Sequence, residues 1–284
     1  MTTEPVALLP APGSPALRRR QLRAVFRNEL ARSFGSRRAI LLYLAAFAPI
    51  GLAIVVALVT MLEPEGQSPA TASQTYAWIY QVFVLRLVLF FGNVWAFINL
   101  FRGEVLDRSL HFSFLTPARR ELIVLGKFLA GVTGTSLLFG AATLVSYVVM
   151  FLPFGSAGLV DFVFAGPGLG QAAAYVGITA LACVGYGSLA LLLGLFFTNS
   201  VLPALVLFAW ETIEFLLPGA LKRVSVIHYL KSLAPLPLSD GPFAIVAEPS
   251  PAWVSIGGLL VLAAVLVTIA CWRARRFEIR YGED

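Results

Sequence analysis

The chain of 284 residues is 58% hydrophobic and 13% charged, with a mean hydropathy of +0.84. This composition excludes a soluble globular domain and predicts an all-α polytopic membrane protein. The net charge of +6 is distributed according to membrane topology, as described below, so it does not indicate a nucleic-acid-binding surface.

The N-terminal region divides into two parts. Residues 1–16 are rich in Pro and Ala and predict a disordered tail, whereas residues 17–38 predict an amphipathic interfacial helix. Apolar residues recur there at three- and four-residue spacing, and the arginines fall largely elsewhere on the helical wheel. Such a helix would lie in the headgroup layer and contact anionic lipid. A membrane-surface elbow and a docking surface for a partner both fit it, and a basic juxtamembrane tail is the alternative.

Residues 39–272 predict a domain of six transmembrane helices, because its apolar runs approach or reach the ~20 residues that cross a bilayer. The predicted spans are Ala39–Leu62, Ile79–Phe101, Gly131–Phe154, Gly170–Phe197, Ser200–Leu217 and Trp253–Trp272. Small residues spaced by four in the third and fourth spans predict close packing of neighbouring helices. These pairs are Ser136 with Gly140, Ala173 with Gly177, and Ala190 with Gly194.

The distribution of Lys and Arg predicts the orientation. Basic residues concentrate before the first span, in the loop 102–127 and in the tail 273–284, whereas residues 63–78 and 155–169 contain none. The positive-inside rule therefore places both termini and the loop 102–127 in the cytoplasm. The loop 218–252 must then face outward, although it carries Lys222, Arg223 and Lys231. Its half-apolar composition predicts a re-entrant loop with one or two short helices dipping into the outer leaflet.

No pattern in the chain predicts catalysis or a bound cofactor. A phosphate-binding loop would need an upstream glycine and a Ser or Thr after Gly126-Lys127, but Phe128 follows. The sequence has no H-E-x-x-H motif, and its two histidines, His111 and His228, are predicted on opposite sides of the membrane. Cys183 and Cys271 fit small core residues. We therefore expect a protein that is not an enzyme and holds no metal.

Three charged residues fall within the predicted spans. Arg86 lies roughly 10 Å below the outer boundary, and Glu211 and Glu214 are predicted at a similar level. Charges at such depth are costly and are paired or functional. One interpretation is an ion pair of Arg86 with a glutamate, preferably Glu214. The other is a polar vestibule on a translocation pathway, lined by the two glutamates.

The loop 102–127 has the pattern of a docking surface. Charged residues at its start give way to an apolar helix candidate, Leu110–Leu115, and Thr116 and Pro117 are placed to cap and begin the next helix. A short helix on the membrane surface could receive a movement from a soluble partner. An ordinary solvated loop is the alternative interpretation.

The same loop resembles permease subunits of the type-2 ABC exporter family. The resemblance rests on Arg-Gly-Glu-Val-Leu-Asp-Arg-Ser-Leu, then Leu-Thr-Pro-Ala-Arg-Arg-Glu, then Gly-Lys-Phe-Leu-Ala, within residues 102–130. The N-terminal helix, the six spans and the half-apolar outer loop also fit that family. The resemblance implies a permease in the inner membrane of a prokaryotic cell, working as two copies with two ABC ATPase subunits. ATP and Mg²⁺ would bind those subunits, and membrane lipids but no nucleic acid would contact this chain.

The resemblance also implies roles for individual residues. The segment matching Leu110–Thr116 would be the coupling helix, with apolar anchors in its second half and a polar rim of arginines. The residues assigned to the coupling loop are Glu104, Asp107, Arg108, Phe112, Phe114, Leu115, Thr116, Pro117, Arg119, Arg120 and Glu121. A secondary transporter or channel driven by an ion gradient through the intramembrane charges is the rival hypothesis, and a membrane scaffold that recruits a cytosolic protein is a third.

Overall fold

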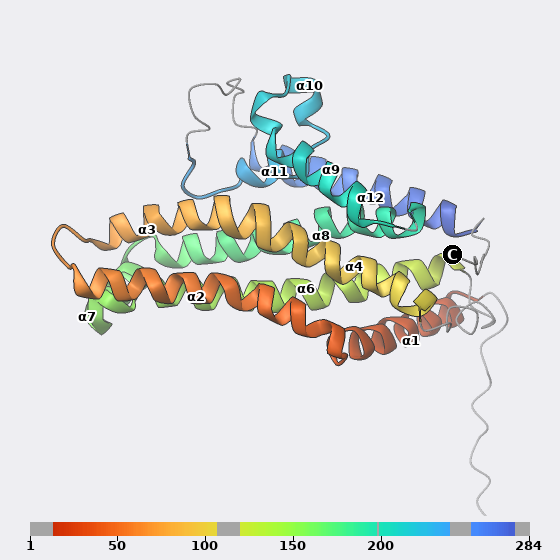
Figure 1. The fold of residues 1–284 in the computed structure, drawn as a ribbon, viewed down its shortest axis with the longest axis horizontal. Coiled ribbons are helices and arrows are strands. Elements are labelled where there is room, and N and C mark those ends of the chain that lie inside the picture. The colour runs from red at the N-terminus through yellow and green to blue at the C-terminus, as the bar shows by residue number, and fades with distance from the viewer. Residues whose placement is uncertain (1–13, 107–119, 198, 239–250, 276–284) are drawn as a thin grey trace, which may run out of the picture.

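The computed structural model describes residues 14–106, 120–197, 199–238 and 251–275, and every regular element in these ranges is helical (Figure 1). The elements are α1 (Pro15–Phe34), η1 (Arg37–Ala39), α2 (Ile40–Leu62), α3 (Pro69–Trp78), η2 (Ile79–Val88), α4 (Leu89–Leu106), α6 (Arg120–Phe151), η3 (Leu152–Phe154), α7 (Gly155–Val160), η4 (Asp161–Ala165), α8 (Gly168–Phe196), α9 (Val201–Thr212), η5 (Glu214–Leu216), α10 (Gly219–Lys222), α11 (Val226–Lys231) and α12 (Ala252–Arg275).

Five helical segments are long and apolar enough to cross a membrane, which makes this a membrane-embedded helical protein. They are Ile40–Leu62, Pro69–Leu100, Arg120–Phe154, Gly168–Phe196 and Ala252–Arg275. The predicted span Ser200–Leu217 is different: α9 has 12 residues, or about 18 Å of helix, which is well short of a bilayer core. The helix ends at Thr212, and the chain then turns through η5 and two short helices.

Two spans begin earlier than predicted. The second starts at Pro69 because Ser68 and Thr71 form a capping box and the proline occupies the first turn. The third starts at Arg120, because the buried face of α6 continues toward the N-terminus through Ile123, Val124 and Lys127. The segment between α4 and α6 is therefore shorter than the predicted loop 102–127.

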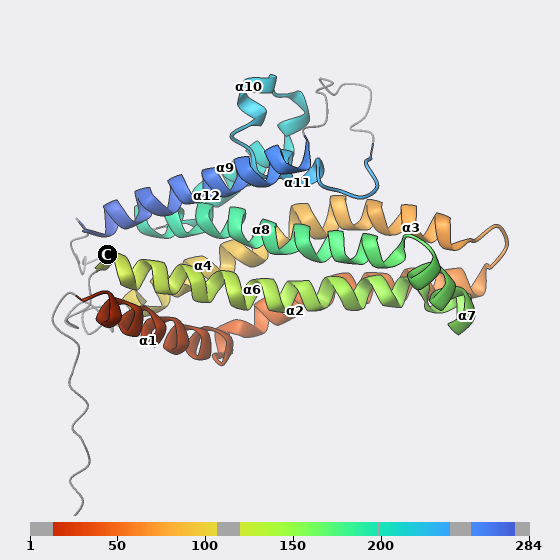
Figure 2. The same cartoon turned by 180° about the vertical axis from the view of Figure 1, so that it is seen from behind.

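The helices α6 and α8 pack against each other at the centre, and α2, α4, α1 and α12 surround them (Figure 2). Phe97 of α4 is fully buried and fits between two glycines. A Cβ atom at Gly131 or Gly187 would lie 2.7 or 2.6 Å from the Phe97 ring, so only glycine allows this approach. The predicted small-residue contact is confirmed at Gly194, which lies against the α4 backbone, and is wrong at Gly177, which has no neighbour within 4 Å.

A cluster of buried tyrosines connects α3, η2, α6 and α8 toward the end of the bundle where α3 lies. Tyr76, Tyr80, Tyr147 and Tyr175 have ring centroids 4.6–6.3 Å apart. Three of the four hydroxyls have partners inside the protein: that of Tyr76 donates to the carbonyl oxygen of Thr143 at 3.0 Å, that of Tyr80 to the carbonyl oxygen of Tyr175 at 3.0 Å, and that of Tyr147 to the carbonyl oxygen of Gly168 at 3.2 Å. The buried hydroxyl of Tyr175 has no partner among the described residues. Buried hydroxyls need such partners, so the cluster fixes the relative positions of these helices.

The helix predicted at residues 17–38 corresponds to α1, which starts two residues earlier, at Pro15 with Ser14 as its N-cap, and ends at Phe34. It lies lengthwise against α6 (Figures 1 and 2). Val25 contacts Gly126, and the ring of Phe34 occupies the space beside Gly134. The apolar residues of α1 thus pack on a neighbouring helix, and its position in the headgroup layer stays a prediction.

Figures 1 and 2 show how the chain passes along the bundle. The start of α1, the end of α4, the start of α6 and the end of α12 lie at one end, and α3 and α7 lie at the other. The path α9–η5–α10–α11 leaves the first end and α12 returns to it. The start of α1 and the end of α12 therefore lie at the same end of the bundle, and the side of the membrane that this end faces stays a prediction.

Cysteine labelling tests whether the segment from α9 to α11 reaches the outer side of the membrane. In a background with Cys183→Ala and Cys271→Ala, we expect Ser14→Cys to react with an impermeant maleimide only after the cytoplasm is opened. Ser68→Cys should react in intact cells, because the charge distribution places it outside. Arg223→Cys should react in the same way, because the predicted order of the spans places the loop 218–252 outside. If Arg223→Cys instead reacts only after the cytoplasm is opened, as expected for Ser14→Cys, the α9–α11 segment lies on the cytoplasmic side. The predicted outward position of the loop 218–252 would then be wrong.

Candidate coupling site and buried charges

Most of the predicted coupling loop, from Asp107 to Arg119, lies outside the described residues, including Arg108, Phe112, Phe114, Leu115, Thr116 and Pro117. Glu104 falls in the last turns of α4, while Arg120 and Glu121 form the first turn of α6. The structure therefore shows where this loop starts and ends, and what holds those two ends.

The beginning of α6 is attached to the end of α12. The carboxylate of Glu121 accepts a hydrogen bond from Nε of Arg275 at 2.7 Å, and Arg120 donates to the carbonyl oxygen of Arg275 at 3.4 Å. The Arg275 side chain is 62% exposed, so this ion pair contributes little to stability. Its value is positional, because it joins the last helix to the start of α6, next to the predicted loop.

A stronger attachment lies two turns into α6, at the Gly-Lys motif. The Lys127 ammonium is 1% exposed, lies 2.9 Å from the carboxylate of Glu29 in α1, and donates to the carbonyl oxygen of Leu100 in α4 at 3.0 Å. Gly126, next to Lys127, leaves room for the side chains of Leu22 and Val25, which lie on the same face of α1 as Glu29. The motif thus binds three helices together at the level where α4 leads into the loop.

The hydrogen bond to the Leu100 carbonyl explains why a lysine occupies this buried position. An ammonium has three donors and is expensive to bury unless a counter-charge and hydrogen bonds compensate it. Here the carboxylate supplies the charge, and the α4 carbonyl supplies an acceptor. A displacement of the loop would therefore move α1, α4 and α6 together, which is the mechanical property that a coupling site needs.

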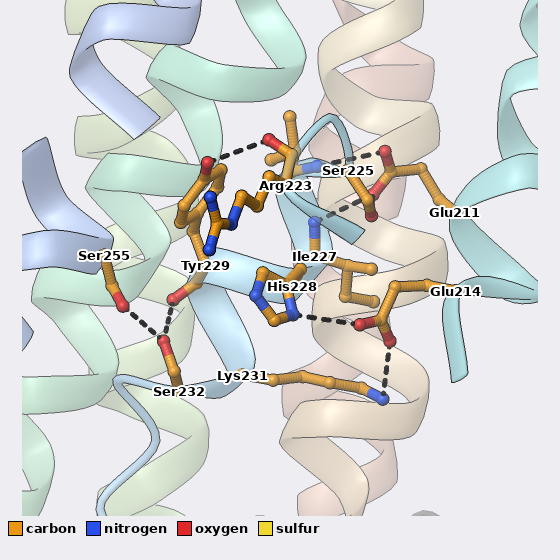
Figure 3. A network of polar contacts seen from close by, with 11 residues as sticks. Glu211, Glu214, Arg223, Ser225, Ile227, His228, Tyr229, Lys231, Ser232 and Ser255 are labelled. Carbon is orange, nitrogen blue, oxygen red and sulfur yellow. Dashed lines mark hydrogen bonds and ion pairs between the residues drawn. The ribbon is translucent and has the colours of Figure 1, made fainter. Parts of the chain in front are cut away.

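A second charged cluster lies in the α9–α11 segment (Figure 3). Glu211 is 4% exposed, and its two carboxylate oxygens accept hydrogen bonds from the N–H of Val226 at 3.1 Å, the N–H of Ile227 at 2.8 Å and the hydroxyl of Ser225 at 3.0 Å. These donors lie at the N-terminus of α11, so the Glu211 side chain caps that helix although Glu211 itself belongs to α9. The carboxylate thereby holds α11 against α9.

Glu214, on the short turn η5, contacts two side chains of α11. Its Oε1 lies 3.1 Å from Nδ1 of His228, and its Oε2 lies 3.4 Å from the ammonium of Lys231 (Figure 3). The turn is outside the five candidate spans. Burial raises the pKa of Glu214, but the hydrogen bond with His228 and the nearby lysine charges outweigh it and hold that pKa below its usual value.

This network accounts for two of the three basic residues that conflict with the charge rule, whereas the third, Arg223, is exposed. Lys231 faces Glu214, and Lys222 is 3% exposed, so neither presents its charge to the aqueous surface as a loop residue would. The prediction of one or two short helices in the loop 218–252 is confirmed by α10 and α11. Their position in the outer leaflet stays a prediction.

The predicted ion pair between Arg86 and a glutamate is not formed. Arg86 donates to the carbonyl oxygen of Thr212 at 3.4 Å, so it does lie beside the end of α9, at the level of both glutamates. The carboxylates, however, have turned toward α11. The physical reason is that α11 offers backbone N–H groups and the side chains of Ser225, His228 and Lys231, which the sequence positions alone did not bring into range.

In the described part of the chain, no group of three or more His, Cys, Asp and Glu residues could hold a metal ion. A scan against protein-family models found no match, and a search of curated proteins found no significant similarity. The class that the structure defines is therefore a membrane-embedded helical protein. Its particular function is a proposal that rests on the sites described above.

The buried pair of Lys127 and Glu29 predicts a strong and specific coupling. Lys127→Met strands a buried carboxylate and should lower the free energy of unfolding by about 3 kcal/mol, and Glu29→Gln should also be costly. The double variant should recover part of that loss, measured by thermal unfolding in detergent. Arg275→Gln serves as the control, with an expected cost below about 1 kcal/mol because its ion pair is exposed. Purely additive effects of the two substitutions would contradict the pairing.

The contacts of Glu214 predict which neighbour couples to it energetically. In double-mutant cycles on the melting temperature, Glu214→Gln should be coupled to His228→Ala, because the two side chains are in contact. The cycle of Glu214→Gln with Arg86→Leu should be closer to additive, since Arg86 reaches a backbone carbonyl instead. A larger coupling with Arg86 than with His228 would restore the direct ion pair and overturn the assignment.

Proposed function

We propose that this chain is the transmembrane permease subunit of an ABC exporter and moves its substrate with energy from ATP hydrolysis by a separate ATPase. In this proposal two copies of the chain work with two ATPase subunits in a prokaryotic inner membrane. ATP and Mg²⁺ bind those subunits, and the chain itself performs no catalysis. The loop between α4 and α6 is the contact with the ATPase.

The observation that carries the proposal is the attachment of the loop's two ends. Lys127 joins α6 to α1 and to the carbonyl of Leu100 in α4, and Glu121 joins α6 to Arg275 of α12. A force applied between Leu106 and Arg120 therefore reaches four helices through short polar contacts. A simple connecting turn between two spans would not require a buried ion pair at its base.

The rival hypothesis of an ion-driven transporter receives less support. It assigned the translocation pathway to Glu211 and Glu214, but both carboxylates are buried in contacts that hold α11. A carboxylate that binds and releases an ion must exchange its partners during each cycle. Here that exchange would release the N-terminus of α11 and cost the hydrogen bonds that position it.

Co-purification with an ATPase tests the proposal. The chain, co-expressed with an ABC ATPase encoded beside it, should co-purify in detergent as a complex of two plus two and hydrolyse ATP in liposomes. Replacing Phe112 and Phe114 by Ala should weaken ATPase binding or separate hydrolysis from transport, because these side chains are the proposed apolar anchors. Transport by the lone chain on an ion gradient would refute the proposal.

A matched control distinguishes a specific role of the loop from a general effect of losing apolar side chains. Phe47 and Phe164 are 64% and 75% exposed and lie on α2 and η4, away from the base of the loop. Replacing both by Ala also removes two phenylalanine side chains and should leave ATPase binding unchanged. Equal effects of the two double variants would mean that the loop has no special role.

A further inference from the structure

Arg86 is a charged residue near the middle of a membrane span. The second span runs from Pro69 to Leu100, so Arg86 lies roughly 20 Å of helix or more from either end. It belongs to η2, which is a π-helix, and this rare type of helix is frequently found at functional sites. A charge at such depth is costly, so Arg86 needs either a counter-charge or a function.

No carboxylate lies within ion-pair distance of Arg86 in the part of the chain that the structure describes. Its guanidinium carries five donors and makes one hydrogen bond there, to the carbonyl oxygen of Thr212 at 3.4 Å, which is a long contact. Glu211 and Glu214 do not compensate it, because their oxygen atoms accept from groups of α11 (Figure 3). The guanidinium therefore keeps donors and a charge for a ligand.

A second donor without a partner lies near this guanidinium. The Tyr186 side chain in α8 is 1% exposed, and its hydroxyl has no hydrogen-bond partner among the described residues. Arg86 and Glu211 both lie within electrostatic range of it. Because buried hydroxyls are normally paired, the two donors point to the same ligand chemistry, a negatively charged acceptor.

An apolar cavity lies along the same two helices, α4 and α9. One turn before Thr212, the ring centroid of Phe208 lies 4.8 Å from that of Phe91. Phe91 and Leu87, the residue after Arg86, line a cavity of about 650 Å³ between α2, α4 and α9. That volume is in the range that small ligands occupy. The cation and the cavity are therefore separated by about one helical turn.

We propose that Arg86 and Tyr186 bind the carboxylate of an amphipathic acid whose apolar chain occupies the cavity between α2, α4 and α9. The guanidinium donates two parallel hydrogen bonds to the carboxylate, and the Tyr186 hydroxyl donates a third. One guanidinium and one carboxylate compensate each other, so the charge at this depth is paired. The inference needs only that the chain is embedded in a membrane, so it is independent of the proposed transport function.

The depth and the charge of Arg86 select this occupant over two others. The phosphate of a bilayer phospholipid lies in the headgroup layer, outside the ~30 Å hydrocarbon core, whereas Arg86 lies near the middle of its span. A second copy of the chain that covered the cavity with its own α2 would bring no anion, because α2 contains no charged residue. A single-chain acid supplies the anion and the apolar chain in one molecule.

Native mass spectrometry of the detergent-solubilised chain, titrated with palmitate, tests the anion site. We expect one palmitate per chain, and weaker binding of hexadecanol, which has the same chain length without the charge. Arg86→Gln should weaken palmitate binding about tenfold or more, because charge-assisted hydrogen bonds are lost. The matched control is Arg223→Gln, which removes the same charge from an exposed position outside the site and should leave palmitate binding unchanged.

A second pair of variants separates a binding role from a structural one. Tyr186→Phe removes a hydroxyl without a protein partner, so the melting temperature should not fall, yet palmitate binding should weaken about fivefold. Tyr76→Phe removes a hydroxyl that donates to the carbonyl oxygen of Thr143. It should therefore lower the melting temperature and leave palmitate binding unchanged.

Three results would overturn the proposal. They are a wild-type chain that binds no palmitate, equal palmitate binding by the wild type and Arg86→Gln, and a Tyr186→Phe variant that melts earlier while its palmitate binding is unchanged. A co-purified phospholipid that is recognised by its mass and lost in Arg86→Gln would also count against it, because the site would then bind a lipid phosphate instead of a carboxylate.

Discussion

The buried ammonium of Lys127 is the constraint on which one half of the bundle depends, the half where α1, the end of α4 and the start of α6 meet. A lysine at 1% exposure is stable only where a carboxylate and a hydrogen-bond acceptor are both within reach, and here they come from two other helices. The position of α1 against α6 and the end of α4 are therefore determined together. Gly126 completes the arrangement, because any larger residue there would push α1 away from the lysine.

Glu211 imposes the corresponding constraint on the α9–α11 segment. A helix of six residues such as α11 has little stability of its own, since its first N–H groups lack partners. Glu211 accepts from two of them and from Ser225, so a buried charge and an unstable short helix compensate each other. Both clusters follow the same rule: a charge inside the bundle is retained where it connects separate segments of the chain.

The helical membrane class, the helix α1 and the short helices α10 and α11 could be predicted because apolar runs and helical spacing are local properties. The shortness of the fifth predicted span could not be predicted, because Ser200–Leu217 is apolar enough by composition, and where its helix ends depends on where Glu211 and Glu214 find partners. The same long-range contacts explain the Arg86 pairing: Arg86 does lie beside the end of α9, but the direction in which the two carboxylates point depends on α11. Lys127 was recognised only as half of a family motif, since its partner Glu29 is almost a hundred positions away.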